Sequence, residues 1–123
     1  MGLSIQLVNT TLTAEMERQA KGKGKGKKGQ SAVSDIVSYL LEDGEFEAVL
    51  TTVGRDALPT LARIDPYDDT EFDHYFCELA LAELDRVAGR PLSVAENSFL
   101  SELRLMFQQA LSEPAYIVRF IGD

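Results

Sequence analysis

Alternating apolar and polar positions along the chain predict three β-strands. Near the start, Leu3, Ile5 and Leu7 fall on one face of residues 3–8, which is the pattern of a half-buried strand. Residues 115–121 are mainly apolar on both faces and rich in aromatic and β-branched side chains, so we expect a central strand there. Residues 58–64 predict the third strand, in which Pro59 can occupy only the start or a sheet edge.

Apolar positions repeated at intervals of three and four residues predict helices. The second helix begins at Ser31 or Ser34, and the last begins with a capping box formed by Ser93 and Glu96. The predicted helices cover residues 14–20, 31–43, 45–53 (which also fits a strand), 70–88 and 93–112. We therefore expect an α+β fold, in which a small sheet of about three strands (N-terminal, central and C-terminal) is packed by four to five helices.

Size and composition fit one globular domain spanning residues 1–123, because 45% of the residues are hydrophobic and 26% are charged. The single cysteine, Cys77, permits no internal disulfide. Residues 1–13 lack the basic and apolar regions of a secretory signal, and no stretch reaches the ~20 apolar residues that span a bilayer. We therefore expect a cytoplasmic protein with no membrane partner.

The charge is distributed unevenly along the chain. All five lysines lie in residues 21–28, mostly alternating with glycine, while the other residues include 7 Arg against 20 acids, a net charge of −13. We interpret residues 21–30 as a flexible, exposed loop. Weak contact of Lys21–Lys28 with nucleic acid is one interpretation, but we favour a solvated insertion lying against the protein's own acidic surface. Nucleic acid and anionic membranes are otherwise disfavoured as partners.

A carboxylate-rich junction separates the predicted third strand from the helix at 70–88. Pro66 forces the strand to end, and Asp69 or Thr70 can cap the helix. Carboxylates are also the ligands that Ca²⁺ prefers, although the EF-hand pattern is absent. The weak candidates for an irregular metal site are Asp65, Asp68 and Asp69. The turn and the cap already account for these residue types, and we favour that interpretation.

The junction and the end of the chain resemble a group of small bacterial proteins of uncharacterised function. In that group a strand leads into D-P-Y-G-D-T-x-F-N and a helix, and a last strand ends in G-D. The matching residues are Asp65-Pro66-Tyr67, Asp69-Thr70-x-Phe72 and Gly122-Asp123, whereas Asp68 and Asp73 replace the group's Gly and Asn. The resemblance covers about a quarter of the chain and implies a shared fold but no activity.

Acidic side chains on the predicted helices form a candidate surface for a partner. The candidate residues are Glu71, His74, Glu78 and Asp85, together with Glu45 and Glu47. Proteins that bind basic nucleases are often small and acidic, because electrostatic steering accelerates their association. We therefore expect a non-enzymatic protein-binding module of the immunity or inhibitor kind, with a basic protein such as a nuclease toxin as its partner. A solvated face that keeps the protein soluble explains the same charges.

Two alternatives are a Ca²⁺-binding regulatory protein and a small enzyme. His74 and Cys77 lie three residues apart on a predicted helix, but a zinc site needs further ligands, so we expect a surface histidine and a buried cysteine. Glu83 projects from the apolar arc of the same helix and needs a partner, and a structural ion pair is favoured over an acid–base pair. Its candidate partners are Arg63, Arg104 and Arg119. We expect no enzymatic activity and no cofactor.

Overall fold

A computed structural model describes residues 2–22 and 35–122, so residues 23–30 of the predicted Lys/Gly loop lie outside the described part. The strands are β1 (Ser4–Asn9), β2 (Ile36–Leu41), β3 (Thr70–Phe72) and β4 (Tyr116–Ile121). The α-helices are α1 (Thr10–Gly22), α2 (Glu45–Val53), α3 (His74–Val87) and α4 (Val94–Ser112). Two short 3₁₀ helices, η1 (Arg55–Ala57) and η2 (Leu61–Arg63), connect α2 to β3. The predicted α+β class is confirmed.

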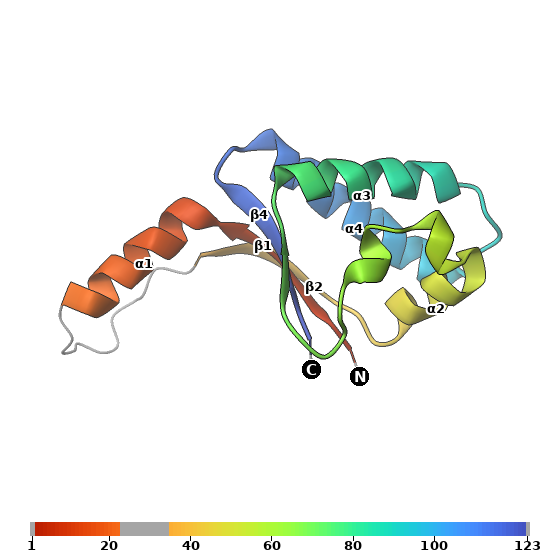
Figure 1. The fold of residues 1–123 in the computed structure, drawn as a ribbon, viewed down its shortest axis with the longest axis horizontal. Helices are drawn as coiled ribbons and strands as arrows, with labels where there is room; N and C mark the ends of the chain where they lie inside the picture. Colours follow the sequence, from red (N-terminus) through yellow and green to blue (C-terminus); the bar gives the residue numbers. More distant parts are fainter. Residues whose placement is uncertain (1, 23–34, 123) are drawn as a thin grey trace.

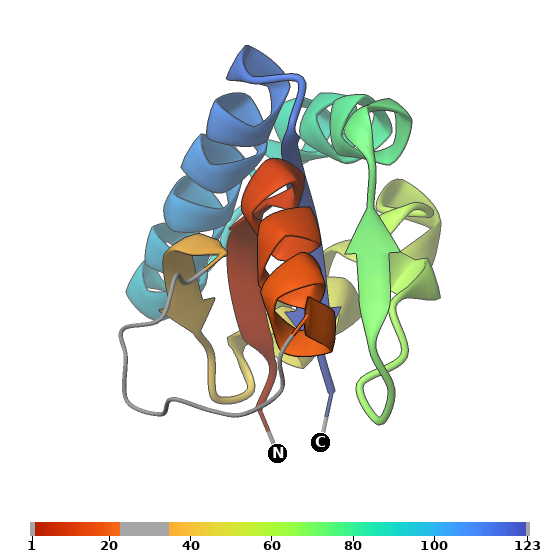
Figure 2. The same cartoon turned by 90° about the vertical axis from the view of Figure 1, so that its left-hand side faces the viewer.

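The four described strands form one antiparallel sheet in the order β2-β1-β4-β3. β1 and β4 occupy the centre, as the apolar pattern of residues 115–121 predicts, and Ser4 lies opposite Ile121. The start of β1 and the end of β4 therefore lie side by side (Figures 1 and 2). The sheet has one strand more than the sequence predicted: β2 and β3 were both assigned to helices, and the strand predicted for residues 58–64 is not among the four.

Helices α2, α3 and α4 lie on one face of the sheet, whereas α1 continues from the end of β1 and projects away from that layer (Figure 1). The core lies between the three helices and the sheet. In it, the rings of Phe72 and Phe107 stack at a centroid distance of 6.2 Å, and Phe120 meets Phe72 at 5.0 Å. Ile5 and Leu7 of β1 are fully buried on the same side. We call the opposite side of the sheet the outer face.

Residues 36–41 form β2, so the helix predicted for residues 31–43 is wrong over this part, and its predicted starts at Ser31 and Ser34 lie outside the described residues. A short apolar run fits both the helical and the strand period. The β-branched Ile36 and Val37 and the aromatic Tyr39 favour a strand, and pairing with β1 satisfies its backbone. Gly44, which would have ended the predicted helix, instead precedes α2 with a φ of 105°, a conformation that favours glycine.

Residues 58–64 do not form the predicted strand. They instead form a turn and then the 3₁₀ helix η2, and η1 lies just before them. Leu58, Leu61 and Ile64 are all buried, and their three-residue spacing is the period of a 3₁₀ helix. The apolar residues that suggested a strand therefore do reach the core, but from a more tightly wound backbone.

At the carboxylate-rich junction the strand, β3, follows the turn at residues 65–69, whereas the sequence predicted a strand before that turn. β3 pairs with β4, where the sequence predicted the start of a helix. α3 begins at His74, and its cap is Asp73 instead of Asp69 or Thr70. The Asp73 side chain accepts a hydrogen bond from the backbone N–H of Phe76 at 3.1 Å. The sharp turn at residues 65–69 therefore leads into a sheet edge.

The other predicted helices are present. The capping box of α4 is confirmed, because Ser93 Oγ accepts from Glu96 N–H at 3.0 Å and Glu96 Oε1 accepts from Ser93 N–H at 2.9 Å. α1 begins earlier than predicted, at Thr10, because the Asn9 side chain accepts from Thr11 N–H at 3.0 Å. In the described part of the chain, no helix has the length and apolar character needed to cross a membrane.

Candidate functional site

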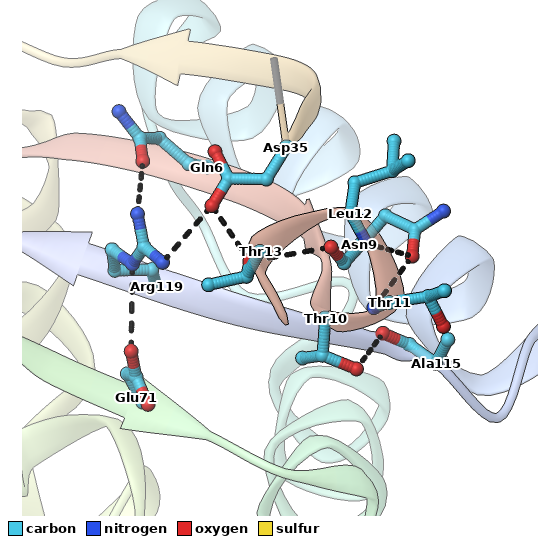
Figure 3. Close-up of polar contacts among 10 residues, drawn as sticks. All are labelled: Gln6, Asn9, Thr10, Thr11, Leu12, Thr13, Asp35, Glu71, Ala115 and Arg119. Carbon is cyan, nitrogen blue, oxygen red and sulfur yellow. Dashed lines mark hydrogen bonds and ion pairs between the residues drawn. The ribbon is translucent and has the colours of Figure 1, made fainter. Parts of the chain in front are cut away.

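Arg119 lies near the centre of the outer face, in a cross-strand row with Tyr39, Gln6 and Glu71. Its guanidinium donates to Gln6 Oε1 at 3.3 Å and forms ion pairs with Asp35 Oδ2 at 3.6 Å and Glu71 Oε2 at 3.4 Å (Figure 3). Only 23% of the Arg119 side chain is exposed. Because two carboxylates already neutralise its charge, Arg119 is suited to joining the strands and poorly suited to holding an anionic substrate.

Asp35 also fixes the base of α1. Its Oδ2 accepts a hydrogen bond from Thr13 Oγ1 at 2.7 Å, and Thr10 Oγ1 donates to Ala115 O at 2.7 Å (Figure 3). The first turn of α1 is therefore attached to the segments that precede β2 and β4. Asp35 was not among the predicted site residues, although an arginine inside an otherwise apolar strand indicates that an acidic partner is needed.

A second feature lies at the edge of the sheet formed by β3 and the turn before it. We call it the acidic edge, and it consists of Asp65, Asp68, Asp69, Glu71 and Asp73, all exposed. Asp65 Oδ1 accepts from Tyr67 N–H at 2.9 Å, and Asp68 Oδ1 accepts from Asp69 N–H at 2.8 Å. Of these five carboxylates, only Glu71 has a basic partner among the described residues, namely Arg119. Backbone donors therefore hold several of these carboxylates in place while most of the charge stays unneutralised.

The acidic edge does not have the geometry of a metal site. Within the described ranges, no group of three or more His, Cys, Asp or Glu side chains could hold a metal ion. The three candidates for Ca²⁺, Asp65, Asp68 and Asp69, instead belong to a turn whose backbone two of them stabilise. The structure therefore gives no support to the Ca²⁺ alternative.

Gly122 anchors the acidic edge to the end of β4. Its backbone N–H donates to Asp68 O at 3.0 Å, and Asp68 N–H donates to Asp65 O at 3.2 Å. A Cβ atom at Gly122 would lie 2.5 Å from both the N and the O of Asp68 and 2.7 Å from Pro66 O. Only glycine permits this close approach of the end of β4 to the turn.

Gly122→Ala is expected to lower the free energy of unfolding by about 1–3 kcal/mol, because the turn backbone must move away from the added methyl group. Urea denaturation measures this loss, and hydrogen exchange of residues 65–69 should become faster. Gly54→Ala is the control: it has a φ of 90° but nothing within 4 Å, so it tests backbone strain without a clash. Equal exchange at residues 65–69 in both variants would contradict the anchoring role.

Glu83 is buried, with 4% of the residue exposed, as its position in the apolar arc of α3 predicts. In place of the predicted arginine, Thr60 supplies both partners: its N–H donates to Glu83 Oε1 at 2.9 Å and its Oγ1 donates to Oε2 at 2.5 Å. No ion pair to Glu83 occurs among the described residues. Of the candidate partners, Arg63 lies over the Phe76 ring at 5.2 Å from its centroid. Thr60 reaches α3 because residues 58–64 form a turn and the 3₁₀ helix η2 in place of the predicted strand.

His74 and Cys77 are not arranged as a catalytic pair. Cys77 is fully buried, and its thiol lies 3.7 Å from Phe72 O. Burial, reinforced by the negative charge of Asp73, raises the pKa of the Cys77 thiol to about 12, so it stays protonated at neutral pH. His74 Nε2 instead lies 2.9 Å from Glu113 O, next to the end of α4.

The six predicted partner-binding residues are divided among three elements. Glu45 and Glu47 lie on α2, Glu71 lies on β3, and His74, Glu78 and Asp85 lie on α3. Glu47 is paired with Arg55 at 3.4 Å and Asp85 with Arg104 at 2.5 Å. A hydrogen bond from Asp43 N–H lowers the pKa of Glu45. Because the Glu71 side chain meets Arg119 on the outer face and α2 and α3 cover the other face, these residues do not make one surface.

A hollow of about 180 Å³ lies beside β3. The residues that line it are Thr60, Arg63, Thr70, Glu71, Phe72 and Phe76. Glu83 and His74 are not among them, and Glu71 is already paired with Arg119. The hollow therefore does not gather the acid, base and cation that the enzyme alternative requires.

Comparison with protein-family models, with curated proteins and with solved structures found no match to this chain. The resemblance of the junction to small bacterial proteins therefore stays a prediction.

Proposed function

We propose that this chain is a non-enzymatic, acidic protein-binding module of the immunity or inhibitor kind, and that a basic protein such as a nuclease toxin is its partner. The acidic edge is the surface that would meet this partner. The single observation that carries the proposal is the exposure of its five carboxylates on the turn, on β3 and at the cap of α3, with Arg119 as their one basic neighbour among the described residues.

A fixed array of charges has two advantages over a mobile one. It attracts an oppositely charged partner at long range, which raises the association rate, and little side-chain or backbone entropy is lost when the complex forms. The anchor at Gly122 and the hydrogen bonds of Asp65 and Asp68 provide this rigidity. The net charge of the whole chain, −8, has the same sign as the acidic edge.

The test uses surface-immobilised protein and a panel of purified nuclease domains, some basic and some neutral. We expect at least one basic domain to bind, with an association rate that falls steeply between about 50 and 500 mM NaCl because salt screens charge. The triple variant Asp65→Asn, Asp68→Asn, Asp69→Asn should lower that association rate about tenfold or more. Asparagine keeps the side-chain acceptor that the turn uses, so the fold is preserved.

A matched control removes three charges elsewhere. Glu17→Gln, Glu102→Gln and Glu113→Gln change exposed side chains outside the acidic edge and give the same net charge as the triple asparagine variant. If both triple variants slow association equally, net charge is responsible and the acidic edge is not the binding surface. If no basic domain binds at low salt, the proposal of a basic nuclease partner is rejected.

A further inference from the structure

β2 lies at the edge of the sheet opposite β3 and is uncharged, in contrast to the acidic edge. Its six residues carry no charge, and several of its large side chains are exposed, Tyr39 by 66% and Leu41 by 67%. Among the described strands, β2 pairs with β1 alone. An uncharged apolar strand at a sheet edge favours pairing with another strand.

The two edges differ in how they would receive a second strand. β3 has three residues and is surrounded by the carboxylates of the acidic edge, and charged side chains on a short edge strand discourage pairing. β2 is twice as long, with six residues, and has none of these features. Any strand that adds to this sheet is therefore expected at β2.

We propose that β2 pairs with β2 of a second copy of this chain, forming a two-fold symmetric dimer with a continuous antiparallel sheet. Charge decides between possible partners. A basic partner would be attracted to the acidic edge, whereas β2 offers it no complementary charge. Two copies that each carry −8 repel one another wherever carboxylates face each other, so an uncharged edge is where they can approach most closely.

The alternation of side chains along a strand restricts the register. In an antiparallel pair, residues directly opposite each other point to the same face of the sheet. Tyr39 lies opposite Gln6, in the row of Arg119 on the outer face. A symmetric pairing centred on Tyr39, the register we propose, keeps this face continuous and places Leu41 opposite Val37 of the second copy. Three exposed side chains per copy, Val37, Tyr39 and Leu41, then cover one another.

Sedimentation velocity tests the dimer with the full chain. We expect a reversible dimer whose dissociation constant falls as salt is added, because salt screens the repulsion between the copies, whereas binding of a basic partner weakens with salt. Tyr39→Asp puts two like charges at the symmetry axis and should raise the dissociation constant about tenfold or more. Tyr75→Asp is the matched control, since Tyr75 is 62% exposed on α3 and should leave the dimer unchanged.

Cysteine cross-linking tests the register. Cα atoms directly opposite in an antiparallel pair lie about 4.5–5.5 Å apart, which is within the range of a disulfide. Tyr39→Cys should therefore form a covalent dimer under mild oxidation, whereas Tyr75→Cys should not, and the native Cys77 is buried and unreactive. A wild-type chain that stays monomeric at about 100 μM would overturn the dimer, since the exposed edge would then be unused at any relevant affinity. A dimer that Tyr39→Asp does not weaken and Tyr39→Cys does not cross-link would overturn the β2 interface.

Discussion

Glu42→Ala is expected to lower the free energy of unfolding by about 3 kcal/mol, because three backbone N–H groups lose the carboxylate that accepts their hydrogen bonds. The buried Glu42 carboxylate accepts hydrogen bonds from Leu3 N–H at 2.8 Å, Gly44 N–H at 3.0 Å and Phe46 N–H at 2.9 Å. These donors belong to the segment before β1 and to the start of α2. Glu42 therefore joins the sheet to the helical layer and satisfies the N-terminus of a helix.

Two further variants separate the contributions of Glu42. Glu42→Gln should lose about half as much as Glu42→Ala, since its remaining oxygen can still accept from Gly44 and Phe46 while its amide group faces the N–H of Leu3. Asp43→Ala, at the neighbouring exposed position, should change stability by less than about 0.5 kcal/mol. Urea denaturation of the three variants measures these differences. A small effect of Glu42→Ala would mean that the three donors find other acceptors.

Glu83 and Thr60 give the second large effect, and it is expected to be non-additive. Glu83→Leu leaves the buried N–H and hydroxyl of Thr60 without their acceptor, and Thr60→Val leaves one buried carboxylate oxygen without its donor. Each single change should cost about 2–4 kcal/mol. The double variant should be less destabilised than the sum by about 1 kcal/mol or more, because one apolar contact then replaces the hydroxyl–carboxylate pair.

A thermodynamic cycle over the wild type, the two single variants and the double variant measures this coupling. Glu78→Ala provides a control on the same helix, because Glu78 is exposed and does not line the hollow beside Thr60, so it should add independently to Thr60→Val. Strict additivity of Glu83→Leu and Thr60→Val would show that the two side chains do not act as a pair. Coupling between the two stability losses is expected if Glu83 has a structural role and not a catalytic one.

The sequence was sufficient to predict elements whose apolar spacing and end signals agree. α4 has both an apolar stripe and the capping box of Ser93 and Glu96, and β4 has a long aromatic and β-branched run. β2 has neither a clear apolar spacing nor an end signal. Its six apolar and small residues fit both the helical and the strand period, and only the pairing with β1 decides between them. Leu58, Leu61 and Ile64 repeat every third residue, a signal of 3₁₀ structure that is easily taken for a strand.

The candidate surfaces were predictable only in part. Clustering of carboxylates in residues 65–73 is visible in the sequence, but their place at a sheet edge depends on β3, which was assigned to a helix. The partners of Arg119 lie far from it in sequence, with Gln6 separated by 113 residues, and no local pattern indicates such a contact. The exposed edge of β2 could not be foreseen while those residues were predicted to be helical.

The strand order has a consequence for how the protein is made. β1 lies near the start of the sequence and β3 lies in its middle. They join one sheet only when both pair with β4. A ribosome therefore has to release residues 116–121 before the central strand pair can close, and until then β1 has one bare edge in addition to that of β2. Such a chain completes its fold after synthesis of β4, and a chaperone that shields nascent β1 would improve its yield.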